Sequence, residues 1–149
     1  MQPIRRKTVV LLNLVALVPF LACSDSTEPE NGDTQQDFTG SYTLVSIAQG
    51  TQAGVINIPG ATGSATLTAT DYEVSLTLPQ LPPDPPITID DEGTYSAMGS
   101  ATAGSWSQQS SLDVNLQYSG TYTYDTATEQ LTLDTTATGI RTVLVLQKT

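Results

Sequence analysis

The sequence predicts an all-β protein, an antiparallel meander of about eight strands that closes into a small up-and-down barrel. After residue 22, apolar and polar residues alternate with a period of two in several runs, and no helical period is sustained. Turn-forming residues separate these runs about every 8–12 residues, which is typical of a barrel or a sandwich. Sequential strands usually pair with their neighbours, and closure removes exposed sheet edges, so we expect a closed barrel.

Residues 40–47 form the first expected strand, because this segment is rich in β-branched and aromatic side chains. Residues 50–64 are expected to form a long loop, since they include four glycines. Three aliphatic residues nevertheless lie in this loop: Val55, Ile56 and Ile58. We favour a short strand or a loop packed against the domain, and a flap over the barrel mouth is the alternative.

Two half-buried strands are expected next, at residues 64–70 and 72–78, where apolar residues alternate with Thr, Ser and Glu. Asp71 lies between them, at a tight turn. Residues 78–86 contain five prolines and cannot supply ladder hydrogen bonds, so they predict a stiff, extended connection. A proline-rich ligand for a partner domain is the alternative interpretation of this connection.

The second half of the domain continues the strand pattern. Residues 87–90 resume strand character, and the acidic residues 90–93 are expected to turn the chain. Later strands are expected at residues 105–107, 112–118, 122–124, 131–133 and 140–147, with a hairpin turn at residues 125–129. Residues 143–146 are continuously apolar, which indicates a strand buried on both faces or one where the barrel closes.

Residues 1–22 have the form of a secretory signal, with three basic residues before an apolar stretch too short for a comfortable membrane span. The junction of Ala22 and Cys23 resembles the cleavage site of bacterial lipoprotein signal peptides. This resemblance implies cleavage before Cys23 and a lipid such as palmitate on that residue. It places the exported protein on the cell envelope, at the outer membrane on its periplasmic or surface face. An ordinary secretory signal with an incidental cysteine is the alternative.

Residues 23–37 are expected to form a flexible acidic tether, and residues 38–149 a single domain, because residues 24–36 lack any aliphatic or aromatic side chain. The mature chain keeps only Arg141 and Lys148 against 15 carboxylates, a formal charge of −13. Nucleic-acid binding needs a basic surface, so this composition excludes it and leaves the acyl chains on Cys23 as the link to the membrane.

A Gly-x-Tyr tripeptide recurs at Gly40, Gly93 and Gly120, with spacings of 53 and 27 residues that favour a recurring hairpin unit. With the strand patterns around it, this succession resembles small bacterial lipocalin-like lipoproteins. The resemblance implies a lipocalin-like barrel over residues 38–149. Lipocalins usually carry a first-strand Trp beneath a late Arg, and Tyr42 and Arg141 stand at these places, so we expect a cation–π contact between them.

The chain contains no His and one Cys. Imidazole metal sites and Ser-His-Asp or Cys-His nucleophile systems are therefore excluded, and no phosphate or dinucleotide motif is present. The sequence predicts a protein that is not an enzyme and that has no catalytic residue, cofactor or metal site. Four acidic residues could offer oxygen ligands to calcium, but an acidic turn explains them better: Asp84, Asp90, Asp91 and Glu92.

Five aromatic residues are expected to line the interior for a small hydrophobic ligand: Tyr42, Tyr72, Tyr95, Trp106 and Tyr118. A barrel of this length is narrow, so side chains that fill it completely are the alternative. Two functions remain open. The first is a lipid-anchored binding protein, which a cavity of on the order of several hundred Å³ would favour. The second is a non-enzymatic structural or interaction lipoprotein with a protein partner, which a filled core and an exposed apolar patch would favour.

Overall fold

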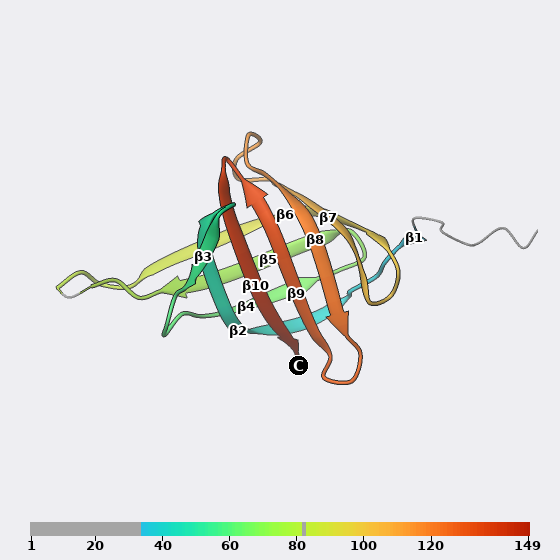
Figure 1. Cartoon of the computed structure of the whole chain (residues 1–149), viewed down its shortest axis with the longest axis horizontal. Helices are drawn as coiled ribbons and strands as arrows, with labels where there is room; N and C mark the ends of the chain where they lie inside the picture. Colours follow the sequence, from blue (N-terminus) through green and yellow to red (C-terminus); the bar gives the residue numbers. More distant parts are fainter. Residues whose placement is uncertain (1–33, 82) are drawn as a thin grey trace, which may run out of the picture. The chain divides into compact units, whose positions relative to one another are not determined.

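The structure, a computed structural model, describes residues 34–81 and 83–149 (Figure 1). The expected signal peptide, the cleavage and lipidation residues Ala22 and Cys23, and most of the expected tether lie outside these residues. The described residues form ten strands: β1 (Thr34–Gln35), β2 (Gly40–Thr51), β3 (Gly54–Asn57), β4 (Thr62–Leu67), β5 (Asp71–Leu78), β6 (Ile87–Gly99), β7 (Ala103–Ser110), β8 (Gln117–Asp125), β9 (Gln130–Ala137) and β10 (Ile140–Lys148).

Eight of these strands form a closed antiparallel barrel, which confirms the predicted fold class. The strands β2, β4, β5, β6, β7, β8, β9 and β10 pair in chain order, and β10 returns to pair with β2. The two short strands lie outside this ring: β3 pairs with β2, and β1 pairs with β6. The barrel is therefore an up-and-down meander in which every barrel strand has a partner on each side.

The connections divide the barrel into two ends. At one end, which we call the closed end, lie residues 36–39, 68–70, 100–102 and 126–129. At the other, the open end, lie β3 with residues 58–61, the described residues 79–81 and 83–86 of the Pro-rich connection, residues 111–116 and the turn 138–139. In Figure 1 the Pro-rich connection lies at the far left, and β1, where the described chain begins, lies at the right.

Aromatic side chains fill the closed half of the barrel. Phe38 lies over its end, with its ring centroid 5.0 Å from that of Tyr122 and 5.4 Å from that of Tyr124. Trp106 stacks on Tyr95 at 4.6 Å and an interplanar angle of 12°. Offset and edge contacts of this kind stabilise a core beyond simple area burial. The closed half is thus a packed core.

The Gly-x-Tyr tripeptides have a packing role in this narrow interior. In each of β2, β6 and β8 the glycine and the tyrosine share the inner face, because side chains alternate along a strand. Gly93 lies opposite Tyr72, and Gly120 lies opposite Trp106. A small residue beside each large ring lets the rings fit within a small barrel.

Two expectations about secondary structure are wrong. Residues 90–93 do not turn the chain, because β6 continues from Ile87 to Gly99 and pairs with β5 through this segment. Residues 112–116 form a loop and not the start of a strand, and β8 begins at Gln117. Asp113 closes this loop: its side chain accepts a hydrogen bond from the Asn115 N–H, and its carbonyl accepts one from the Leu116 N–H.

Other expectations are refined. The loop at residues 50–64 contains β3, as the favoured interpretation predicts, and the Ile58 N–H donates to the Ile47 carbonyl at 2.9 Å. The apolar segment of β10 lies where the barrel closes, between β2 and β9. The paired chain also begins before residue 38, since Thr34–Gln35 pairs with β6 and the Gln36 N–H donates to the Ala97 carbonyl.

Candidate functional site

The five aromatic residues expected to line a ligand cavity fall into two groups. Tyr42, Tyr95 and Trp106 are buried in the packed closed half. Their polar groups have protein partners there: the Tyr42 hydroxyl donates to the Phe38 carbonyl at 2.8 Å, and the Tyr95 hydroxyl donates to the Thr68 carbonyl at 2.6 Å. Tyr72 is buried in the same core, directly after the closed-end turn at residues 68–70, whereas Tyr118 is half-buried at the start of β8, next to the open-end loop 111–116. Of the five, only Tyr118 is placed to meet a molecule that enters at the open end.

A polar network occupies the inner face between the packed half and the open end. It begins at Trp106, whose indole N–H donates to Gln108 Oε1 at 2.9 Å. It continues at Asp91, which accepts a hydrogen bond from the Tyr72 hydroxyl at 2.8 Å and another from the Ser110 hydroxyl at 2.5 Å. Among the described residues, no buried side-chain nitrogen or oxygen lacks a hydrogen-bond partner. The network is therefore satisfied and fixes the position of the Asp91 carboxylate.

The surroundings of Tyr72 and Tyr118 raise the pKa of both hydroxyls. Burial raises the pKa of Tyr72, and the hydrogen bond to Asp91 raises it further. Burial also raises the pKa of Tyr118, with a smaller contribution from the negative charge of Asp91. Both hydroxyls thus remain protonated at neutral pH, as hydrogen-bond donors beside an anionic acceptor.

Sequence reasoning considered Asp91 only as part of an acidic turn at residues 90–93, and so missed that its side chain faces the barrel interior. In the structure the alternation of β6 points Asp91 inward and its neighbours Asp90 and Glu92 outward. The four acids considered for calcium therefore do not converge. In residues 34–81 and 83–149, no three His, Cys, Asp or Glu side chains are grouped so that they could hold a metal ion.

Most of the exposed large apolar side chains belong to the open end. Seven of the eight large apolar side chains that are exposed in the described residues belong to this end, and we call them the open rim: Ile56, Leu81, Ile87, Ile89, Leu112, Val114 and Ile140. The eighth, Val45, lies on the outer wall of the barrel. Scattered exposed apolar residues are ordinary, but a group at one end of a barrel is typical of a binding surface.

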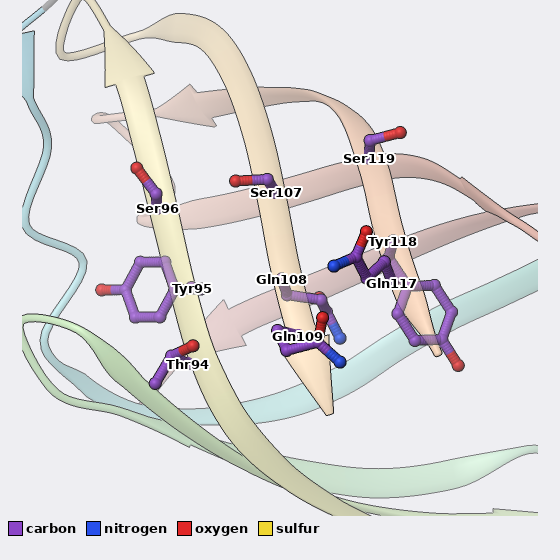
Figure 2. A pocket seen from close by; sticks show the side chains of 9 residues that line it. All are labelled: Thr94, Tyr95, Ser96, Ser107, Gln108, Gln109, Gln117, Tyr118 and Ser119. Atoms are coloured by element: carbon purple, nitrogen blue, oxygen red, sulfur yellow. The ribbon is translucent and has the colours of Figure 1, made fainter. Parts of the chain in front are cut away.

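A polar groove of about 430 Å³ lies on the wall formed by β6, β7 and β8 (Figure 2). Strand alternation places its hydroxyl and amide side chains on the outer face: Thr94, Ser96, Ser107, Gln109, Gln117 and Ser119. Two of these side chains have structural partners. The Gln109 amide donates to the Val114 carbonyl at 3.1 Å, and the Ser96 hydroxyl donates to Gln35 Oε1 at 2.9 Å. The groove partly serves to hold the 111–116 loop and β1.

The expected contact between Tyr42 and Arg141 does not form. Tyr42 points into the barrel near the closed end, whereas Arg141 lies on the outer face near the open end. Arg141 instead donates to both carboxylate oxygens of Asp134, at 2.8 and 2.6 Å. This hydrogen-bonded pair lowers the pKa of Asp134. The late Arg of the sequence therefore belongs to a surface ion pair.

Comparison with known proteins adds the following. No protein-family model matches the chain, and no curated protein matches it. Among solved structures, the chain is similar to a redesigned β-barrel, b11L5F_LGL, with a TM-score of 0.46 and 15% identity over 75% of this chain and 91% of that one. It is also similar to a redesigned β-barrel, mFAP1, bound to DFHBI, with a TM-score of 0.43 and 16% identity over 74% of this chain and 94% of that one.

The search for membrane-spanning helices gives one further finding. In the part of the chain that the structure describes, no helix is long and apolar enough to cross a membrane.

Proposed function

We propose that this chain is a lipid-anchored binding protein of the bacterial cell envelope that takes a small hydrophobic ligand at the open end of its barrel. The observation that carries the proposal is the separation of the two ends. The packed aromatic half leaves the open half as the place for a ligand, and the residues of the open rim belong to that half. Fixed polar groups within an apolar mouth are the usual makeup of a small-molecule site.

The position of the proposed anchor agrees with this arrangement. The chain enters the barrel at the closed end, where Thr34 pairs with Gly99. Thr34 is eleven positions after Cys23 in the chain. A chain of that length spans at most roughly 40 Å when fully extended. Acyl chains on Cys23 would hold the closed end near the bilayer, so the open end is free to exchange ligand with the surrounding medium.

Radioactive palmitate tests the anchor. We expect the parent protein to incorporate label and to fractionate with outer membranes, and we expect Cys23→Ser to lose the label. Incorporation that is unchanged in Cys23→Ser would contradict the lipoprotein proposal.

The binding proposal is tested with Nile red, a neutral dye whose fluorescence rises in apolar sites. We expect Ile89→Gln to weaken dye binding by about tenfold, because it replaces an apolar side chain of the open rim. Val45→Gln is the matched control, since Val45 is equally an exposed strand residue but lies on the outer wall. Equal affinities for the two variants would remove the support for a ligand site at the open end.

A second candidate function is an interaction lipoprotein whose open rim docks a protein partner. The same group of exposed apolar side chains favours it, together with the filled closed half. This candidate predicts no retained small molecule in native mass spectrometry of the purified protein. It also predicts that a photo-crosslinker at Leu112, but not one at Val45, captures a single envelope protein. Retention of a small molecule in the mass spectrum would favour the first function.

A further inference from the structure

We propose that the ligand of the open end is a cationic amphiphile, an organic ammonium group with an apolar chain, whose charge is bound by Asp91. This inference rests on the proposed function and adds the chemical class of the ligand. It follows from the charge, the aromatic surroundings and the apolar border of one position in the barrel.

Asp91 is a half-buried carboxylate with no positive charge beside it. Its side-chain partners are the neutral hydroxyls of Tyr72 and Ser110. Among the described residues the only cations are Arg141, which pairs with Asp134, and Lys148, which lies at the closed end opposite Tyr42. The Asp91 carboxylate therefore accepts hydrogen bonds from neutral donors, but no positively charged side chain balances its negative charge. A half-buried carboxylate attracts a cation more strongly than one on an open surface.

The surroundings of Asp91 suit an organic ammonium group better than an inorganic ion. Tyr118 is half-buried on the same inner face, and the negative faces of aromatic rings attract ammonium groups that carry carbon substituents. A metal ion would need several converging oxygen ligands, and no such group exists among the described residues. The site thus has one fixed anionic group and one half-buried aromatic ring, while the ring of Tyr72 belongs to the core.

An apolar border continues from Asp91 to the open end. Ile89 and Ile87 follow Asp91 at every second position of β6, so all three side chains share the inner face. Ile89 lies opposite Leu76, and Ile87 lies opposite Leu78, which extends the apolar border across β5. A ligand with its charge at Asp91 would lay an alkyl or aryl body along this border.

The outer face of the same hairpin adds negative potential. Glu73 lies directly opposite Glu92 across β5 and β6, and Asp90 is next to them on the outer face of β6. Like charges placed opposite each other repel, and a nearby cation relieves that repulsion. The surface acids would thus raise the local concentration of a cationic ligand, while Asp91 fixes its position.

Three ten-carbon probes test the inference: decyltrimethylammonium, 1-decanol and decanoate, which differ in charge but share an alkyl chain. Titrations use the purified mature chain with Cys23→Ser, at about 0.15 M salt to screen surface charge. We expect decyltrimethylammonium to bind about tenfold more tightly than 1-decanol, and decanoate to bind least. Binding of none of the three would overturn the proposed function itself.

The variants separate the ligand class from the function. Asp91→Asn keeps one oxygen as an acceptor for Tyr72 or Ser110 and presents its NH2 group to the other hydroxyl, which can accept from it. We expect this variant to bind decyltrimethylammonium only as well as 1-decanol. Asp90→Asn, which removes the same charge from the outer face, should keep most of the preference. Equal losses in the two variants, or no preference in the parent protein, would overturn the inference and leave the proposed function standing.

A second variant covers the case in which Asp91→Asn does not fold. We expect Tyr118→Leu to keep the apolar volume but remove the aromatic ring, so ammonium affinity should fall about fivefold while 1-decanol affinity stays level. A loss that is equal for the two probes would overturn the inference, because it would indicate damage to the apolar border alone.

Discussion

Replacement of Gly120 by alanine should destabilise the barrel strongly, although alanine is the smallest possible side chain to add. Gly120 lies on the inner face of β8, between Trp106 of β7 and Thr135 of β9. A Cβ atom at this position would lie 1.9 Å from the Asp134 carbonyl oxygen and 2.8 Å from the Thr135 Cα. Both are backbone atoms that cannot rotate away. Overpacking commonly costs about 1–3 kcal/mol, and this backbone clash places Gly120→Ala at about 3 kcal/mol.

Urea unfolding of the Cys23→Ser chain, followed by tryptophan fluorescence, measures this difference in the free energy of unfolding. A loss of that size also lowers Tm by roughly 10–15 °C. Gly54→Ala is the matched control, because Gly54 is an exposed strand residue with no atom within 4 Å of its added Cβ. We expect the control to change stability by less than about 0.5 kcal/mol. If Gly120→Ala and Gly54→Ala have the same free energy of unfolding, the claim that neighbouring backbone atoms leave no room for a Cβ atom at Gly120 is wrong.

Three further predictions concern the rest of the barrel. Trp106→Ala should cost about 3–5 kcal/mol in urea unfolding, because Trp106 is 2% exposed and stacks on Tyr95, and a cost below about 1 kcal/mol would contradict a filled closed half. Burial raises the pKa of all six tyrosines, so the folded chain keeps protons that the unfolded chain releases above about pH 10. The free energy of unfolding should therefore stay level up to about pH 10 and fall above it. Unfolding at alkaline pH should coincide with the rise in absorbance of ionised tyrosine. Gradual ionisation without unfolding would contradict the burial of the tyrosines. Arg141→Ala should lower Tm only slightly, because both side chains of its ion pair with Asp134 are about one third exposed, and the small effect should vanish in high salt.

The fold could be predicted from the sequence because its strongest signal is local. Alternation over residues 72–78 reports directly on a strand with one buried face, and β5 covers that segment. The recurrence of Gly-x-Tyr reports on packing as well, because the glycine and the tyrosine of each copy share the inner face. Closure of the barrel was predicted because an open meander would leave its first and last strands as exposed edges, and pairing those two strands removes both edges.

The errors arose where tertiary contacts override local preference. Residues 90–93 have the composition of a turn, yet pairing with β5 and then β7 keeps them extended, and Gly93 is needed there for close approach to β7. Leu112 and Val114 continue the alternation of a strand but lie in a loop, where both are exposed. Asp113 was the available signal, because its side chain accepts a hydrogen bond from the Asn115 N–H two residues later, and Asx turns of this kind commonly close loops.

The candidate site was harder to predict, because the direction of Asp91 depends on register. A shift of one residue in β6 would place Asp90 and Glu92 inside the barrel and Asp91 outside. The register depends on which residues lie opposite each other on neighbouring strands, such as a glycine opposite an aromatic ring. A single sequence does not show these pairings. The five aromatic residues lie on the inner face of the barrel, but their division between a packed half and an open half depends on the placement of Phe38.

The two halves of the barrel differ in a way that bears on function. The closed half combines stacked rings, tyrosine hydroxyls that donate to backbone carbonyls, and the entry of the chain, all of which favour rigidity. The open half contains an anionic side chain without a counter-charge and an apolar rim in contact with solvent, both of which cost stability in the isolated protein. Features that cost stability are kept where a bound molecule relieves the cost, since ligand binding stabilises the folded state by mass action. The same reasoning predicts that a ligand that binds in the open half raises Tm. It also predicts that Asp91→Asn, measured without ligand, is at least as stable as the parent chain.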